Sequence, residues 1–476
     1  MNKIAHSLKW VFSTIILRRI LTFLLFWYVI NNFTRAEYGV YRQFLSINVL
    51  FSLLAIFSFN LIAIVEQTKN HFKLGMQFIL ISSVIGSLIM LSIHNFLAVK
   101  YGSEDISKYI LFGFWLVIPE TMKRLVNSIH QLDMNFKLRS IAETANVFVF
   151  VGLTIILFWF DKKFEYYVIA FYIGSLVELI IICFPLRKEI IKDLMNCLLL
   201  KYLKPLKDLM KEKFTFLCVT TTPTVLNIFL ADAPLLLFGF FYTKVEIGNY
   251  SAIAQLIIMP VSLLTLALSQ VYFPAFGKTS KEFLPQSVIT YIKHVVVILW
   301  FPVIIFGLLL KYWSYLLLGS QDIEIITAIL IWLVSRTLFS LLLHPLITIP
   351  IILKKPQYEL YWTIYSLALI CISIYLFKNY NFVTMVAIYT IITIITSLIF
   401  IFTIFKILNM RKSNLIKLLL KGLCYNTPLL LLLFFYESSY NLSIILLIIL
   451  CTLLSAGLLY FFEKKFLLSA IKKVIK

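Results

Sequence analysis

The sequence predicts an all-α polytopic membrane protein, with about fourteen transmembrane helices in two parallel six-helix lobes plus two extra helices. Three observations support this fold class. The chain is 61% hydrophobic and 14% charged, with a mean hydropathy of +0.95, which is outside the range of water-soluble globular domains. Apolar runs long enough to cross a bilayer follow one another with short polar gaps. Finally, one eight-residue motif occurs twice.

The repeated motif has the pattern T-[RK]-x-E-x-G-x-Y and occurs at Thr34–Tyr41 and again at Thr243–Tyr250. Each copy ends one apolar span and opens the next. One copy alone would be ordinary, because glycine suits a helix C-terminus and tyrosine suits the membrane interface. Two copies in the same topological place indicate a duplicated helical bundle, in which the working site commonly lies between the repeats.

The apolar runs define the expected spans. They lie at roughly 10–31, 44–65, 76–98, 107–129, 141–160, 165–186, 214–240, 250–273, 288–311, 322–344, 357–377, 382–405, 415–436 and 441–462. The longest polar stretch, 187–213, separates an N-terminal lobe (1–186) from a C-terminal lobe (214–405), and 406–476 holds two appended helices and a basic tail. Six spans separate the two motif copies, so the lobes are expected to point the same way.

The distribution of basic residues predicts the orientation. Most Lys and Arg residues fall on the links of one side, which places both termini in the cytoplasm. The net charge of +21 then reflects topology and attraction to anionic lipids rather than nucleic-acid binding. The six cysteines show no paired spacing, and we find no phosphate-binding loop or metal-ligand cluster. The outer links are too short for a catalytic domain. We therefore expect no cofactor, no metal and no enzymatic activity.

The candidate site residues are ionisable or amide side chains inside the predicted spans. Such residues are costly in a bilayer and are functional candidates by default. Glu120, Lys123, Arg124 and Asn127 recur at helical spacing and form one stripe on span 4. The stripe either lines a hydrated cavity, which we favour because it explains Lys123, or contains a self-neutralising Glu120–Arg124 pair that joins two helices.

Further candidates lie on other spans. Arg18 and Arg19 on span 1, with Lys123 and Arg124, would make the interior of the first lobe cationic, which suits a diphosphate or an acidic sugar. Alternatively, one of the two span 1 arginines extends back to the cytoplasmic headgroups. Asn227 and Asp232 lie on span 7 beside Pro223 and Pro234, and Arg336 lies deep in span 10. The span 7 polar groups could bind sugar hydroxyls, but we favour the structural role of satisfying the backbone that Pro223 frees.

At this point the chain resembles a known family. The 6+6+2 arrangement, the link Glu37–Tyr41, and Asp232 followed by Ile247–Tyr250 are similar to Wzx-type oligosaccharide flippases, as is Leu318–Ser320 with Ala328–Leu330. These proteins form the polysaccharide-transporter branch of the MOP superfamily, which also contains MATE exporters and the lipid II flippase. Many members carry an arginine after the span 7 aspartate, whereas Ala233 follows Asp232 here.

The resemblance implies a function. A Wzx-type protein moves an undecaprenyl-diphosphate-linked oligosaccharide across the bacterial cytoplasmic (inner) membrane by alternating access, for O-antigen, capsule or exopolysaccharide. Membrane lipids, a polysaccharide polymerase and a chain-length regulator are the implied partners. A lipid II flippase and a MATE-like drug or cation antiporter are the alternatives. The antiporter would favour acidic rather than basic cavity groups, and a polymerase or ligase of the same pathway would need a large outer loop.

Overall fold

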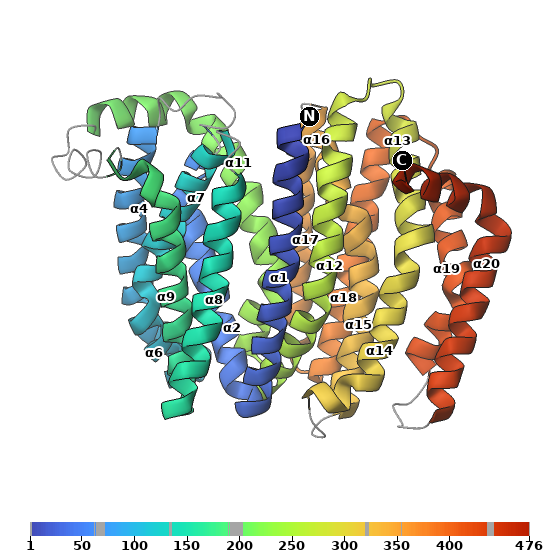
Figure 1. Cartoon of the computed structure of the whole chain (residues 1–476), viewed down its shortest axis with the longest axis horizontal. Coiled ribbons are helices and arrows are strands. Elements are labelled where there is room, and N and C mark those ends of the chain that lie inside the picture. Colours follow the sequence, from blue (N-terminus) through green and yellow to red (C-terminus); the bar gives the residue numbers. More distant parts are fainter. Residues whose placement is uncertain are drawn as a thin grey trace. The chain divides into compact units, whose positions relative to one another are not determined.

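We analysed a computed structural model of the chain, which describes residues 2–60, 62, 72–132, 136–188, 190, 203–318, 323–353, 355–435 and 442–475. Every element in these ranges is helical (Figure 1). Thirteen helical segments are long and apolar enough to cross a membrane among the described residues, as expected for a multi-pass membrane protein. The packing divides the chain into two compact units, Met1–Ala252 and Ile253–Lys476.

The first unit contains most of the polar residues that were predicted to be functional. Its elements are α1 (Asn2–Asn32), α2 (Arg35–Ile56), α4 (Phe72–Ser92), α5 (His94–Lys100), α6 (Glu104–Gly113), η1 (Phe114–Leu116), α7 (Val117–Leu132), α8 (Phe136–Phe160), α9 (Phe164–Cys183), η2 (Phe184–Leu186), α11 (Leu203–Leu237), η3 (Phe238–Phe240) and the start of α12 (Lys244–Lys278). Its helices pack in sequence-distant pairs such as α1 with α8 and α2 with α11.

The second unit continues from within α12. Its other elements are α13 (Leu284–His294), the π-helical turn η4 (Val295–Leu299), α14 (Trp300–Leu318), α15 (Ile323–Leu346), α16 (Ile349–Ile352), α17 (Gln357–Phe377), α18 (Phe382–Ile407), α19 (Lys412–Phe435) and α20 (Leu442–Ile475). Glu463 of α20 has non-helical backbone angles and anchors three helices. Its carboxylate lies 2.6 Å from Lys293 of α13 and 3.3 Å from Lys421 of α19.

The two copies of the repeated motif are helix N-termini. Thr34 is the N-cap of α2, where its hydroxyl accepts from the Glu37 amide while the Glu37 carboxylate accepts from the Thr34 amide. Thr243 and Glu246 form the same pair of contacts at the start of α12. This reciprocal arrangement is a capping box. Both helices therefore begin several residues before the expected starts at 44 and 250.

The glycines of the motif lie inside these helices rather than at helix ends, and they bring the two copies together. A Cβ atom on Gly39 would lie 2.8 Å from the Gly248 amide nitrogen, and one on Gly248 would lie 1.8 Å from the Arg35 carbonyl oxygen. The backbones of α2 and α12 thus touch within the first unit. Close approach through small residues is the usual basis of helix packing in membranes, where burial of apolar surface gives little advantage.

Two expected spans are interrupted. The span predicted at 44–65 stops at Ile56, because Phe57 and Ser58 have positive φ values of 44° and 52°, which side chains other than glycine rarely adopt. The Ser58 hydroxyl accepts a 2.9 Å hydrogen bond from Thr221 of α11. The span predicted at 107–129 is built from α6, η1 and α7, so its α-helical geometry is interrupted at Phe114–Leu116. In the predicted linker 187–213, residues 189 and 191–202 lie outside the described residues, and α11 already begins at Leu203.

Candidate functional site

The polar stripe predicted on span 4 is present on α7, and Lys123 is at its centre. The Lys123 ammonium lies 2.6 Å from a carboxylate oxygen of Glu120 and 3.1 Å from one of Glu178 on α9. Lys123 is 7% exposed and Glu178 is 8% exposed, so both charges are removed from solvent. Glu120 thus pairs with Lys123 rather than with Arg124 alone, and Lys123, the residue for which a hydrated cavity was favoured, has two carboxylate partners within the protein. Glu120 is bound to Lys123, and Lys123 ties α7 to α9.

A glycine on α9 positions Glu178 against α8. A Cβ atom on Gly174 would lie 2.6 Å from the Asn146 side-chain oxygen and 2.9 Å from the Asn146 carbonyl oxygen, so only glycine permits this approach of α8 and α9. One turn later, the Asn146 amide donates a 2.6 Å hydrogen bond to Glu178. On the same face, Ser175 donates a 2.7 Å hydrogen bond to Glu120. Each carboxylate thus accepts from Lys123 and from one neutral donor.

A second ionic group joins α1 to α8. Glu143 of α8 accepts from Arg18 of α1 and lies 2.7 Å from Arg139 of its own helix. Four residues before Arg18, Thr14 donates a 3.1 Å hydrogen bond to Ser140. Glu143 and Asn146 are three residues apart and so lie on one face of α8. Helix α8 therefore connects this group to the Lys123 group.

Two polar atoms of the stripe have no hydrogen-bond partner among the described residues. They are the Arg124 Nε and the Asn127 side-chain oxygen, both buried and three residues apart on α7. The Arg124 guanidinium is close enough to Glu120 for their charges to attract, but Glu120 already accepts from Lys123 and Ser175. A donor and an acceptor that are buried without partners cost free energy, and a polar ligand would remove that cost.

We name these residues the polar cluster, and its charge is unbalanced toward the cationic side. It contains Arg18, Arg19, Lys123, Arg124 and Arg139 with Glu120, Glu143 and Glu178, together with the amides of Asn127 and Asn146. Arg19 has Arg18 as a like-charged neighbour. With all groups ionised, cations exceed carboxylates by two. Such a cluster can bind an anion, and arginine is the side chain whose fork matches phosphate oxygens best.

The remaining predicted residues lie on other elements. Asn227 and Asp232 are half-buried on α11, which packs on α2, where Gln43 donates a 3.2 Å hydrogen bond to the Leu235 carbonyl. Arg336 of α15, in the second unit, has its guanidinium 4.8 Å from the ring centre of Tyr389 on α18, a cation–π contact.

Four members of the polar cluster were not predicted from sequence: Arg139, Glu143, Asn146 and Glu178. The available signal was an acidic side chain within an otherwise apolar span, for both Glu143 and Glu178. Helical periodicity was a further signal for Glu143, which follows Arg139 by four residues and precedes Asn146 by three, whereas Glu178 belongs to no such charged stripe on α9. Arg42 was also missed, because the expected second span began at 44. Its Nε is buried and lacks a hydrogen-bond partner among the described residues.

Comparisons with known proteins give the family and the fold. A family model described as "polysaccharide biosynthesis protein" matches residues 5–280. No curated protein matches significantly. The structure resembles the lipid II flippase MurJ in an inward closed conformation, with a TM-score of 0.67 and 13% identity over 95% of this chain and 100% of that chain.

Two further solved structures have a similar fold. An inward-facing multidrug resistance MATE transporter of the MOP superfamily has a TM-score of 0.57 and 15% identity, covering 82% of this chain and 94% of that one. The Vibrio cholerae MATE transporter VcmN has a TM-score of 0.55 and 14% identity, covering 87% and 100%. Because the family model matches more than half of the residues, the chain belongs to the polysaccharide biosynthesis protein family of Wzx-type flippases, with the fold of MOP-superfamily transporters.

Proposed function

We propose that this protein flips an undecaprenyl-diphosphate-linked oligosaccharide repeat unit from the cytoplasmic to the outer leaflet of the bacterial inner membrane. Movement would be by alternating access, for the synthesis of a surface polysaccharide such as O-antigen or capsule. Family membership supports the substrate class. The observation that carries the proposal is the polar cluster, where Arg124 and Asn127 hold buried polar atoms without partners among the described residues.

The chemistry of the cluster suits the two polar parts of this substrate. Arg124, together with Arg18 and Arg19, supplies positive charge for the diphosphate, while Asn127 can accept from sugar hydroxyls. Glu120 and Glu178 hold Lys123 in place, so these carboxylates shape the site rather than compete for the anion. Asn227, Asp232 and Arg336 are proposed as further path residues. The hydrocarbon tail can remain in the bilayer throughout, because only the polar head needs a hydrated route.

Orientation and partners follow from the same proposal. Both termini would be cytoplasmic, as the distribution of Lys and Arg predicts. The flipped unit would pass to a polysaccharide polymerase and a chain-length regulator at the outer face.

The test begins with deletion of the gene in its host, followed by analysis of surface glycans and lipid-linked intermediates. We expect loss of one surface glycan, with its undecaprenyl-linked unit accumulating on the inner leaflet. Lethality with accumulated lipid II would instead identify a lipid II flippase. Unchanged glycan with altered drug tolerance would identify an antiporter.

Complementation then tests the cluster itself. Arg124→Gln should fail to restore the glycan although the protein accumulates to a normal level, because it removes the cation whose Nε is buried and unpartnered among the described residues. Lys108→Gln is the matched control, since Lys108 forms only an exposed 3.3 Å pair with Asp105. Normal glycan with Arg124→Gln would refute the role of the cluster.

A further inference from the structure

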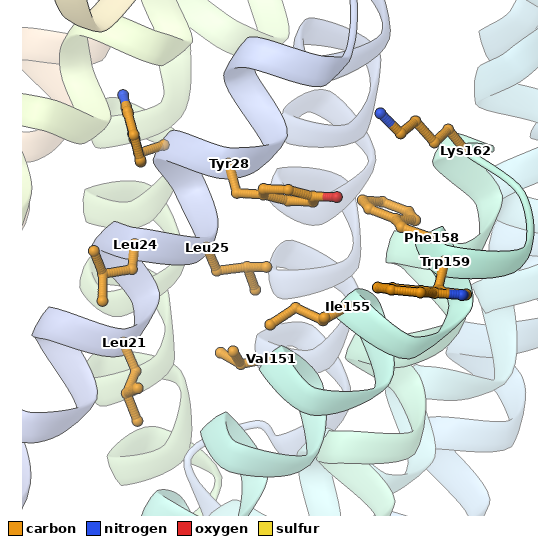
Figure 2. A pocket seen from close by; sticks show the side chains of 10 residues that line it. Leu21, Leu24, Leu25, Tyr28, Val151, Ile155, Phe158, Trp159 and Lys162 are labelled. Carbon is orange, nitrogen blue, oxygen red and sulfur yellow. The ribbon is translucent and has the colours of Figure 1, made fainter.

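A groove between α1 and α8 has features that the proposed transport path does not use. It has a volume of about 710 Å³ and is lined by Leu21, Leu24, Leu25, Trp27, Tyr28, Val151, Ile155, Phe158, Trp159 and Lys162. Figure 2 shows Tyr28 reaching from α1 toward Phe158 of α8, with Lys162 at one end of the groove. Apart from Lys162, its lining is apolar or aromatic.

The floor of the groove belongs to the protein core and its rim faces outward. Leu25 and Phe158 are each 3% exposed, whereas Ile155 is 52% exposed and Trp159 is 85% exposed. Both helices are long and apolar enough to cross a membrane, and the exposed rim residues Ile155 and Trp159 are apolar or aromatic, which suits contact with hydrocarbon. A cleft in that position accepts a hydrocarbon chain and excludes water.

The groove continues the line of contact between α1 and α8, called here the seam, which also holds the Arg18–Glu143 pair of the polar cluster. Arg18, Leu21, Leu25 and Tyr28 follow at intervals of three or four residues, so they share one face of α1. The seam begins with Thr14 against Ser140 and Arg18 against Glu143, then opens into the groove. A lipid whose charged head enters the polar cluster would therefore have its tail beside this cleft.

Lys162, at the far end of the groove, has no acidic partner among the residues that the structure describes. Lys162 donates a 3.0 Å hydrogen bond to the neutral side chain of Asn32. The adjacent Lys163 is different, because it lies 2.7 Å from Asp161, and that hydrogen bond and charge raise the pKa of Lys163. Trp27 and Trp159 also line the groove, and such aromatics are typical of the membrane–water interface. Lys162 is thus placed where a lipid phosphate would lie.

We propose that the α1–α8 groove binds the polyprenyl chain of the lipid-linked glycan, with Lys162 contacting the diphosphate as it reaches the predicted outer leaflet. This inference rests on the proposed function, and it names the tail and exit site of the same substrate. The polyprenyl carrier fits the groove better than a resident phospholipid does, because the groove adjoins Arg18 and Glu143 of the polar cluster.

The experiment is photocrosslinking of the full-length protein in nanodiscs with a photoreactive long-chain polyprenyl diphosphate, followed by peptide mapping. We expect labels concentrated in residues 21–28 and 151–159. Ile155→Trp should fill the groove and abolish this labelling. Leu88→Trp, at a 56% exposed site on α4, is the matched control and should leave the labelling unchanged.

The head-group contact is tested by comparing two neighbouring lysines and two probes. Lys162→Gln should weaken capture of the diphosphate probe about tenfold, as expected for the loss of one charge-assisted hydrogen bond. Lys163→Gln should have no effect, and an uncharged polyprenol probe should not distinguish Lys162→Gln from the wild type.

Two results would overturn the inference. One is labelling spread evenly over lipid-facing helices, and the other is equal labelling of the groove by a photoreactive phosphatidylglycerol. Crosslinking measures binding of the lipid in the groove, whereas gene deletion measures transport. The two experiments therefore distinguish an error in the groove proposal from an error in the proposed flippase function. A glycan-deficient deletion strain with an unlabelled groove would reject only the groove.

Discussion

At the scale of single residues, Lys123 determines how the polar cluster is held together. It is shared by two carboxylates on different helices, Glu120 on α7 and Glu178 on α9. Removing one partner from a buried ionic group leaves an uncompensated charge, which costs far more than the intact group contributes. The lysine is therefore required mainly because the carboxylates are present.

Lys123→Met should lower the free energy of unfolding by about 3–5 kcal/mol, the usual cost of breaking a buried ion pair. Lys108→Met is the matched control, because Lys108 and Asp105 have the same three-residue spacing but are 52% and 44% exposed. That control should cost less than about 1 kcal/mol. Thermal unfolding in nanodiscs measures both.

A combined variant separates charge from packing. Adding Glu120→Gln and Glu178→Gln to Lys123→Met removes all three charges and should recover much of the lost stability. An equal loss in Lys123→Met and Lys108→Met would contradict the assigned role of Lys123.

At the scale of elements, the repeated motif has two physical functions that act together. Thr and Glu close a capping box that starts α2 and α12, and the Gly two residues after the Glu lets these helices touch. The spacing in T-x-x-E-x-G follows from helix geometry. The capping pair spans the first turn, and the glycine comes less than one turn later. Both copies are needed because each helix supplies one half of the contact.

Alanine at either motif glycine should therefore disrupt folding. In Gly248→Ala, the new Cβ would meet the Arg35 carbonyl, and backbone cannot move aside as a side chain can. We expect a reduced yield of monodisperse protein and a lower unfolding temperature for Gly39→Ala and Gly248→Ala. Gly152→Ala, on α8 with nothing within 4 Å of the new atom, is the control and should gain up to about 1 kcal/mol in helix propensity. Wild-type stability in Gly248→Ala would exclude the contact.

At the scale of the whole molecule, orientation in the membrane follows from charge. The chain has a net charge of +21, and basic clusters such as the one around Lys412 lie on links that the positive-inside rule assigns to the cytoplasm. The link between α8 and α9, which contains Lys162 and Lys163, falls on the opposite side. The proposed exit end of the groove depends on this assignment.

Cysteine labelling tests the orientation directly. In a background with the six native cysteines replaced, Lys163→Cys should react with a membrane-impermeant reagent in intact cells. Lys412→Cys should react only after permeabilisation. Both positions are exposed, so access is set by the membrane. The reverse pattern would invert the topology and place the Lys162 end of the groove in the cytoplasm.

The sequence by itself determined that the chain lies in a membrane, which fold class it has and where most of its spans are. These properties depend on hydropathy and charge summed over consecutive residues, so they need no knowledge of distant contacts. For the same reason the stripe from Glu120 to Asn127 was visible, since helical periodicity is local.

Only the tertiary structure decided how those residues are used. Lys123 meets Glu178, which is 55 residues away, and Gly39 meets Gly248 across most of the first unit. The α1–α8 groove exists because sequence-distant helices pack side by side at one end and leave a cleft farther along. Such pairings are set by the complementary shapes of helix faces, a property of two segments together that neither segment encodes alone.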